Sequence, residues 1–409
     1  MDTAAFNALS AWVTDAGLIG RSESELMAGF CRRIFEAGVP LARALVILDT
    51  LHPIYEGRAF RWRADLPETA EVTEYGRTNE GELGEIWRRS AFYHLLQSGG
   101  QVMRRRLVAS DPADFLAIEQ AREEGMTDYL ALVHRFADEG VIGEMDCVYS
   151  SWATDAADGF EDADVLAVQR LAPFLKLAMK SAALVRMAGT LVETYLGRDA
   201  GRRVMSGRIV RGVAEKIGAV LWQSDLHSYT HISETVAPEE IIPFLNDYAD
   251  LVVSVVHGHG GDVLKLMGDG TLAIFAGEDR EAACSAAFAA AVRLRKEAAK
   301  VTRTRSEAGL PVTQVYLALH IGEVFYGNVG SKDRLDFTVI GPAVNEVSRI
   351  LAMSRSVEQD VLLSSVFARA LGPELRDHLV SVGRYALRGV AQPQELFTLE
   401  PSFGLPFPI

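Results

Sequence analysis

The stretch VLKLMGDGTLAIF, residues 263–275, sets two apolar runs on either side of Gly-Asp-Gly. Asp and Gly tolerate the backbone conformations that tight turns need, so the pattern predicts a hairpin with Asp269 in its tip. Lys265 interrupts the first apolar run. On this stretch alone a hairpin explains both polar residues, and any further role depends on what the neighbouring segments bring to the same place.

The segments around the hairpin follow the order βαββαβ. Residues 219–224, AVLWQS, form an apolar strand-like run that leads directly into Asp225, and residues 238–261 carry apolar residues at helical spacing before a pair of glycines. The hairpin is followed by an alanine-rich helix at 279–300, strands at 312–325 and 336–341, and a helix from 342. This order predicts an α+β domain of the ferredoxin-like type, with helices on one face of an antiparallel sheet.

Two carboxylates are expected to meet in this layout. Asp225 ends the first strand and Asp269 lies in the hairpin tip, and the first and third strands of a ferredoxin-like sheet are neighbours. A carboxylate pair without histidine or thiolate partners suits Mg²⁺ or Mn²⁺, which bind one or two carboxylates together with substrate phosphates. The sequence therefore predicts a metal site for phosphoryl chemistry.

Four runs of residues, in the correct order, carry a family resemblance. They are DLHSYT at 225–230, KLMGDGTLAIF at 265–275, HIGEVFYGNVG at 320–330 and RLDFTVIGPAVNEVSRI at 334–350. Together they resemble the motifs of the class III nucleotidyl cyclase catalytic domain, over about residues 205–400. The resemblance implies an adenylate cyclase that converts ATP to 3′,5′-cyclic AMP and pyrophosphate. It also implies two Mg²⁺ or Mn²⁺ ions per site and a site shared between the two chains of a homodimer.

The resemblance also implies roles for single residues. Lys265 and Thr338 match the two residues that read the adenine base, whereas a guanine-reading site would want an acceptor such as Glu at 265. Asn345 and Arg349, four apart on one helix, match the ribose-orienting and transition-state residues. The resemblance further assigns metal binding to Asp225, Leu226 and Asp269. It assigns substrate binding to Asp336 and Arg388.

Two rival functions stay open. A catalytically silent cyclase-fold module would signal by association alone, although competent residues at the carried-over positions argue against it. A cyclase for another nucleotide, such as GTP, is the narrower rival. The pair His227-Ser228 departs from the family pattern, which has Arg or a small residue followed by Gly there, and this departure leaves the catalytic rate open.

Composition narrows the class of protein. The 409 residues are 49% hydrophobic and 23% charged, which suits a globular chain with room for two domains. A net charge of −14 argues against an extended nucleic-acid interface. Three widely spaced cysteines, the lack of a signal-peptide pattern and the lack of a long apolar run predict a reduced, cytoplasmic protein without a membrane span.

The N-terminal part mixes helix and strand signals over residues 22–185. With its closing run GFEDADVLAVQRLAPFLKLAMKSA at 159–182, it resembles a GAF-type sensory domain, which implies regulation by a small molecule or protein that the sequence does not identify. We expect a GAF-like domain at 1–185, a helical linker at 186–204, the cyclase domain at 205–400 and a tail at 401–409. Five large side chains of this part are expected to be buried in the core, with the lining of a ligand pocket as the alternative: Trp62, Trp87, His94, His134 and Trp152.

Overall fold

The computed structural model describes the chain except for residues 79–80, 108–114, 137–144, 391, 402 and 404–409. It divides into two units, Met1–Leu191 and Val192–Ile409. The division lies inside one long helix, α6 (Asp162–Leu196), and within the segment 186–204 that the sequence predicts as a linker. Most of the expected tail at 401–409 lies outside the described residues.

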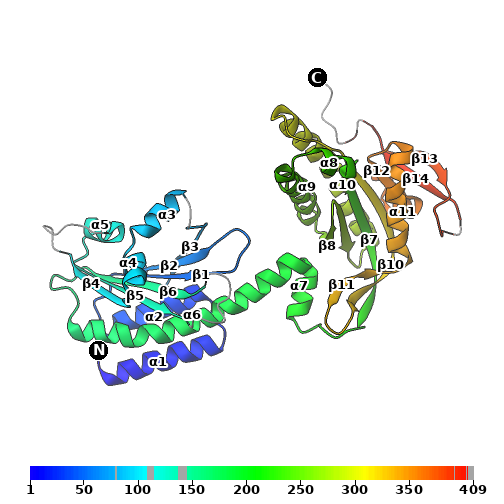
Figure 1. Cartoon of the computed structure of the whole chain (residues 1–409). Coiled ribbons are helices and arrows are strands. Elements are labelled where there is room, and N and C mark those ends of the chain that lie inside the picture. Colours follow the sequence, from blue (N-terminus) through cyan, green and yellow to red (C-terminus); the bar gives the residue numbers. More distant parts are fainter. Residues whose placement is uncertain (79–80, 108–114, 137–144, 391, 402, 404–409) are drawn as a thin grey trace. The chain divides into compact units, whose positions relative to one another are not determined.

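The first unit is a six-stranded sheet between two helical layers (Figure 1). Its strand order is β3-β2-β1-β6-β5-β4, and every adjacent pair is antiparallel. The strands are β1 (Arg43–Asp49), β2 (Gly57–Arg63), β3 (Ala70–Tyr75), β4 (Val102–Arg106), β5 (Asp128–Arg135) and β6 (Cys147–Thr154). Every residue of β6 is buried, because helices cover both of its faces.

Two separate cores lie on the two faces of this sheet. One core is shared with α1 (Thr3–Leu18), α2 (Glu23–Glu36) and α6. The other core is shared with α4 (Ala91–Ser98) and α5 (Leu116–Glu123), and α3 (Gly81–Arg88) lies beside α4. A capping box between Ser22 and Glu25 fixes the start of α2.

The second unit is built on an eight-stranded sheet. Its order is β13-β14-β12-β10-β7-β9-β8, and β11 pairs with β10 off this path. The strands are β7 (Ala214–Leu226), β8 (Asp262–Met267), β9 (Gly270–Ala276), β10 (Val315–Gly330), β11 (Leu335–Ile340), β12 (Val361–Ser364), β13 (Leu379–Tyr385) and β14 (Gln394–Leu399). The predicted neighbourhood of the first and third strands is confirmed, since β7 pairs with β9.

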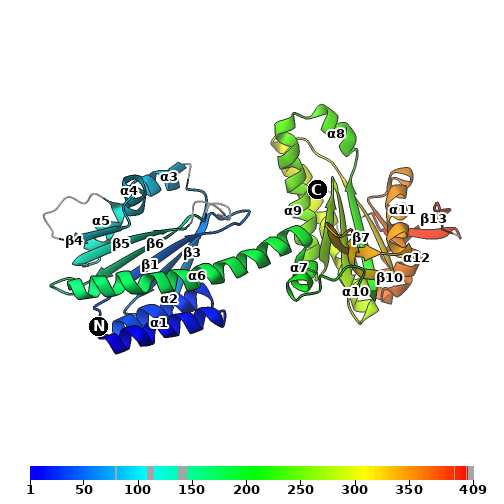
Figure 2. The same cartoon turned by 60° about the horizontal axis from the view of Figure 1, so that its bottom comes forward.

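Helices cover both faces of this sheet (Figure 2). On one face, α9 (Pro238–Gly258) and α10 (Arg280–Glu307) pack over Trp222 and Phe275. On the other face, α11 (Pro342–Val357) packs over Leu221 and Ile274, together with α7 (Arg198–Met205). The expectation of helices on one face holds for α9 and α10 and is wrong for α11, which follows the βαββαβ segments and covers the opposite side.

The remaining helices are short. They are α8 (Tyr229–Thr235), α12 (Ser365–Ala370) and α13 (Pro373–Arg376). The sequence did not reveal α8, and the predicted first strand begins five residues late, at 219 instead of Ala214. The expected helical linker at 186–204 contains the end of α6 and most of α7. Among the described residues, no helix combines the length and apolarity needed to cross a bilayer. The cysteines Cys31, Cys147 and Cys284 are free and buried.

Gly322 sets how closely α11 approaches β10. A Cβ placed on Gly322 would lie 2.6 Å from the Cβ of Ala343 in α11, which is nearer than two carbon atoms can pack. Gly218 is on the adjacent strand β7, and a Cβ there would meet nothing within 4 Å. The two glycines therefore give a matched pair for testing this contact.

We expect Gly322→Ala to destabilise the second unit by about 1–3 kcal/mol, because the added methyl overpacks the helix against the strand. Gly218→Ala should change the free energy of unfolding by less than about 0.5 kcal/mol. Urea unfolding of both variants measures the difference. Equal stabilities would contradict a close approach of α11 at Gly322.

Candidate active site

The two predicted metal-binding carboxylates lie together. Asp225 is the penultimate residue of β7, and Asp269 is in the turn between β8 and β9. Because β7 pairs with β9 from Ala219↔Ala276 to Ser224↔Thr271, the hairpin tip lies beside the end of β7. The two side chains share a hydrogen bond. The sequence-based expectation that these carboxylates converge is therefore confirmed.

Their proximity changes the protonation of Asp225. Burial, the hydrogen bond to Asp269 and the charge of that carboxylate raise the pKa of Asp225 to about 6. Arg355 on α11 acts in the opposite direction. Two adjacent carboxylates, one of them with a raised pKa, form an oxygen-donor site for a hard divalent ion.

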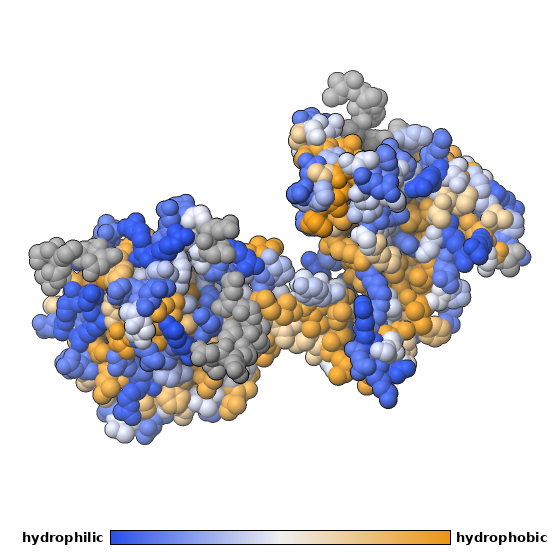
Figure 3. Space-filling view, in the orientation of Figure 1, coloured by the Kyte–Doolittle hydropathy of each residue, from blue (hydrophilic) through white to orange (hydrophobic). Residues whose placement is uncertain are grey.

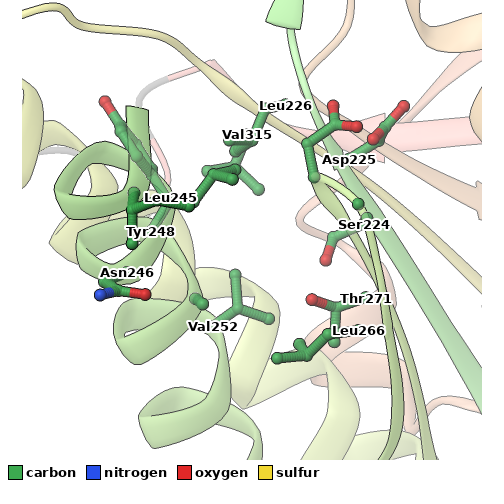
Figure 4. Close-up of a pocket in the computed structure, with 15 residues that line it drawn as sticks. Ser224, Asp225, Leu226, Leu245, Asn246, Tyr248, Val252, Leu266, Thr271 and Val315 are labelled. Atoms are coloured by element: carbon green, nitrogen blue, oxygen red, sulfur yellow. The ribbon is translucent and has the colours of Figure 1, made fainter. Parts of the chain in front are cut away.

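A cavity of about 200 Å³ lies behind this pair (Figure 4). Leu245, Tyr248 and Val252 of α9 line one side of it, and Ser224 and Thr271 line the other. In Figure 4 the hydroxyls of Ser224 and Thr271 point toward α9, whereas the carboxylate of Asp225 points away from the helix. The carboxylate of Asp225 thus borders this largely apolar cavity and does not point into it.

Leu226, also predicted as a metal-site residue, follows Asp225 and ends β7. Its side chain is buried in the core under α9, and its Cα pairs with Val315 of β10. The next residues, His227 and Ser228, begin the turn into α8. Ser228 has φ 55° and ψ 28°, a left-handed conformation that favours glycine, and its side chain makes no capping hydrogen bond with α8. The departure from the family pattern therefore coincides with a strained backbone.

The predicted base-reading residues form a second group. The ammonium of Lys265 on β8 forms an ion pair with Asp336 on β11. Both side chains are partly exposed, at 37% and 40%. Thr338 is two residues from Asp336 and therefore on the same face of β11. The structure thus brings Lys265, Asp336 and Thr338 to one side of this strand.

The remaining predicted residues lie on or next to α11. Asn345 is exposed and Arg349 is half-buried on the next turn of the helix. A Cβ placed on Gly389 would lie 3.6 Å from a terminal nitrogen of Arg349, so the turn that carries Arg388 is next to that guanidinium. Arg388 itself is exposed.

These residues share one face of the sheet. Gln223 of β7 bonds to Ser348 of α11, and Asp225, two residues on, projects to the same face. Lys265 pairs with Leu272, whose side chain belongs to the core under α11. Within one chain, however, the carboxylate pair has Arg355 as its cationic neighbour, whereas Lys265 is bound to Asp336.

The donor set fits a divalent metal. No group of three or more His, Cys, Asp or Glu residues is found among the described residues, so the carboxylate pair is not part of a larger cluster. Two carboxylates and a nearby backbone carbonyl supply only part of an octahedral shell. Water and substrate phosphates would complete it, as Mg²⁺ commonly requires.

Sequence reasoning missed a buried polar network beside these residues. His320 lies in the middle of β10 and is 4% exposed. Its Nδ1 is 2.9 Å from Ser364 Oγ, and its Nε2 is 3.7 Å from Glu346 Oε2 on α11. No local pattern could reveal contacts between residues so far apart in the sequence.

The predicted pocket residues of the first unit are mostly structural. Trp62 and Trp152 are fully buried in the core under α6. His134 Nδ1 is 2.7 Å from the ammonium of Lys176, and burial lowers the pKa of Lys176 to about 7. Trp87 and His94 make ring contacts with Tyr149 and Phe115 respectively.

We expect Asp225→Asn to stabilise the metal-free protein at neutral pH. The pKa of Asp225 rises from 3.8 to about 6 on folding, so the native state binds more protons in this window and wild-type stability falls as the pH rises through it. The side-chain amide of the variant does not ionise, so the variant does not lose this stability as the pH rises. The variant should therefore melt higher than wild type at pH 7 and equally at about pH 4.

Thermal melts in a chelating buffer measure this difference. Asp250→Asn, an exposed change on α9, is the control and should leave the pH dependence as in wild type. A stability gap between Asp225→Asn and wild type that does not vary with pH would contradict the crowding of the two carboxylates.

The comparisons with known proteins concern the second unit. Residues 215–401 match the family model of the adenylate and guanylate cyclase catalytic domain. Adenylate cyclase 1 of Rhizobium meliloti is 34% identical over 144 residues, which cover 34% of this chain and 21% of that protein. An adenylate cyclase of Anabaena cylindrica is 34% identical over 147 residues, covering 36% and 29%. The chain thus spans less than a third of the length of these two relatives.

Solved structures give similar coverage. The guanylyl cyclase Cya2 has 26% identity and a TM-score of 0.40, over 46% of this chain and 93% of that chain. The adenylyl cyclase CyaB from P. aeruginosa has 22% identity and a TM-score of 0.42, over 46% and 95%. Residues 215–401 are therefore similar in sequence to the catalytic domain of the adenylate and guanylate cyclase family.

Proposed function

We propose that this chain is an adenylate cyclase that converts ATP to 3′,5′-cyclic AMP and pyrophosphate. The observation that carries the proposal is the hydrogen-bonded pair Asp225 and Asp269 at the end of β7, inside the segment that matches the cyclase family. The two relatives described above are both named as adenylate cyclases, which favours ATP over GTP.

Each residue has a distinct part in this reaction. Asp225 and Asp269, with the backbone of Leu226, would hold two Mg²⁺ or Mn²⁺ ions. When bound, the ions lower the pKa of the ribose 3′ hydroxyl and neutralise the triphosphate. Lys265 and Thr338 would hydrogen-bond the adenine edge. The ion pair with Asp336 holds the Lys265 ammonium in place for this contact.

The residues on α11 act on the sugar and the phosphate. Asn345 would orient the ribose, so that the 3′ oxygen attacks the α-phosphate in line with the leaving pyrophosphate. Arg349 would stabilise charge on the phosphoryl oxygens in the transition state, where preorganised cationic groups lower a barrier most. Arg388, near Arg349, would bind the phosphates of the leaving group.

The complete site is proposed to form in a homodimer. One chain would supply the aspartate pair, and its partner would supply Lys265 and the α11 residues. Within one chain, Asp225 has Arg355 as its cationic neighbour, whereas Lys265 is paired with Asp336. This separation of the two groups supports the division. Apolar side chains exposed on β8, β10 and β11 suit such an interface, and Figure 3 shows apolar surface in this region of the unit. The exposed apolar side chains on these three strands are Leu266, Met267, Phe325, Val329, Leu335 and Ile340.

Regulation is assigned to the first unit. Its sheet between two helical layers supports a GAF-like sensory role, and the signal would be a small molecule or protein. A silent binding module remains the alternative from another class, and GTP is the alternative substrate. The experiments below separate these functions.

We expect the purified chain to convert ATP to cyclic AMP with Mg²⁺ or Mn²⁺, and to convert GTP, CTP and UTP much more slowly. Asp225→Ala and Asp269→Ala should each lower turnover by at least about 100-fold, because each removes a ligand of ions that the transition state needs. Mass spectrometry of the products measures both results.

Asp250→Ala replaces an exposed carboxylate on α9 and should keep wild-type turnover. Wild-type activity in either Asp225→Ala or Asp269→Ala would reject the metal assignment. Folded wild-type protein that forms no cyclic nucleotide from any substrate would favour the silent module.

A mixed dimer tests the shared site. Asp225→Ala and Arg349→Ala should each be nearly inactive alone. In a mixed dimer with two-fold symmetry both lesions fall in one site, and the other site is intact. Random mixing gives about half mixed dimers with one good site of two, so activity should return to about a quarter of wild type.

The two variants are co-expressed with different tags, and mixed dimers are confirmed by mass before cyclic AMP is measured. Two wild-type chains with the same tags provide the reference rate. Activity of confirmed mixed dimers that does not exceed the sum of the separate variants would rule out a site shared between chains.

A further inference from the structure

The direction in which the side chains of Asn345 and Arg349 point depends on how α11 is rotated about its axis. At about 100° per residue, these two residues lie on the side opposite Val347 and Ile350, whose side chains are fully buried against the sheet. An apolar contact of this kind resists separation of helix and sheet but only weakly resists a small rotation. Groups on the flanks of the helix are better placed to fix that rotation.

Polar contacts hold α11 on both flanks. On one flank, Ser348 Oγ donates a hydrogen bond of 2.6 Å to Gln223 Oε1 on β7. On the other flank, Glu346 Oε1 accepts a hydrogen bond from Gln394 Nε2 on β14, and Glu346 Oε2 faces His320 Nε2 on β10 at 3.7 Å. The side chains of His320 and Glu346 are 5% and 18% exposed, so water competes little for these contacts.

The surrounding hydrogen bonds assign the proton on His320. Ser364 Oγ accepts from the backbone N–H of Phe367 at the start of α12, which leaves its own proton for His320 Nδ1. The remaining ring proton is then on Nε2, directed at the Glu346 carboxylate. Burial lowers the pKa of His320 to about 4, so the ring is neutral near pH 7 and holds this orientation.

We propose that Glu346 is a positioning residue of the cyclase site, which together with His320 and Gln394 fixes the rotation of α11 and so aims Asn345 and Arg349 at the substrate. Gly322 sets the distance between α11 and β10, and Glu346 sets the angle. The inference rests on the proposed function, in which Asn345 and Arg349 act on the sugar and the phosphate.

The central experiment compares Glu346→Ala with Glu346→Gln. The alanine variant loses both contacts, and its kcat should fall about 10- to 100-fold, because small misplacements of catalytic groups cost that much. The KM for ATP should stay within about threefold, since the base-reading residues are on other elements. The glutamine variant should recover most of the activity. Its amide oxygen can accept from His320. Because Gln394 presents its Nε2 donor to position 346, the Gln394 amide must turn over, and its Oε1, which has no hydrogen-bond partner among the described residues, can then accept from the new amide N–H.

Thr398→Val is the matched control for stability. Thr398 is buried in β14, and the hydrogen bond of its hydroxyl goes to the Val361 carbonyl at 2.8 Å and not to α11. This variant should lose stability as Glu346→Ala does, but keep wild-type kcat. An equal fall of kcat in Thr398→Val and Glu346→Ala would reduce Glu346 to a structural residue and overturn the proposal.

A double variant tests whether Glu346 acts through Arg349. On an Arg349→Ala background, the further loss caused by Glu346→Ala should be clearly smaller than in the wild-type background, because one of the two groups that Glu346 aims is already gone. Full additivity would overturn the proposal. If Arg349→Ala alone keeps wild-type activity, the proposed function of the site fails instead, and the two failures are thereby distinguished.

Hydrogen exchange gives a readout that needs no turnover. The backbone amides of α11 should exchange faster in Glu346→Ala than in Thr398→Val at equal global stability, and Glu346→Gln should restore the wild-type rates. Equal exchange of α11 amides in the two destabilised variants would show that Glu346 does not hold the helix.

Discussion

The antiparallel pairing of β7 with β10 is the constraint on which the second unit depends. It runs from Ala214↔Gly327 to Leu226↔Val315 and is the longest pairing in the sheet. Alternate residues of β7 face opposite cores, so Trp222 packs under α9 while Leu221 packs under α11. The same register places Asp225 at the strand end and His320 opposite Leu221 in the centre. A slip of one residue would exchange the two faces and take Asp225 away from the side that carries α11.

Most of this framework could be predicted from local pattern. The apolar runs on either side of Gly-Asp-Gly gave the β8–β9 hairpin, and the βαββαβ order gave the neighbourhood of β7 and β9 from which the meeting of Asp225 and Asp269 follows. The side taken by α11 could not be predicted in this way, because an amphipathic helix carries no mark of which face of a sheet it will cover. Nor could α8, which is too short for its periodicity to stand out.

The polar contacts around α11 show a different limit of sequence reasoning. Glu346 and Gln394 are 48 positions apart, and Gln223 and Ser348 are 125 apart. Nothing near Glu346 in the sequence marks it as different from a solvated helix residue. Lys265 and Asp336, 71 positions apart, are a comparable case. The resemblance to the cyclase family pointed to these two residues separately, and only the fold joins them as an ion pair.

The backbone conformation of Ser228 limits which amino acids can replace it. Its left-handed backbone costs an L-amino acid about 1–2 kcal/mol relative to glycine, and the described residues contain just one other non-glycine residue with positive φ, Glu358. In a library of all substitutions at position 228, glycine should be enriched in a selection for folding, asparagine and aspartate should be retained, and valine, isoleucine and threonine should be depleted. The backbone at the entrance to α8, and not the chemistry of the serine hydroxyl, would then decide which sequences persist at this position.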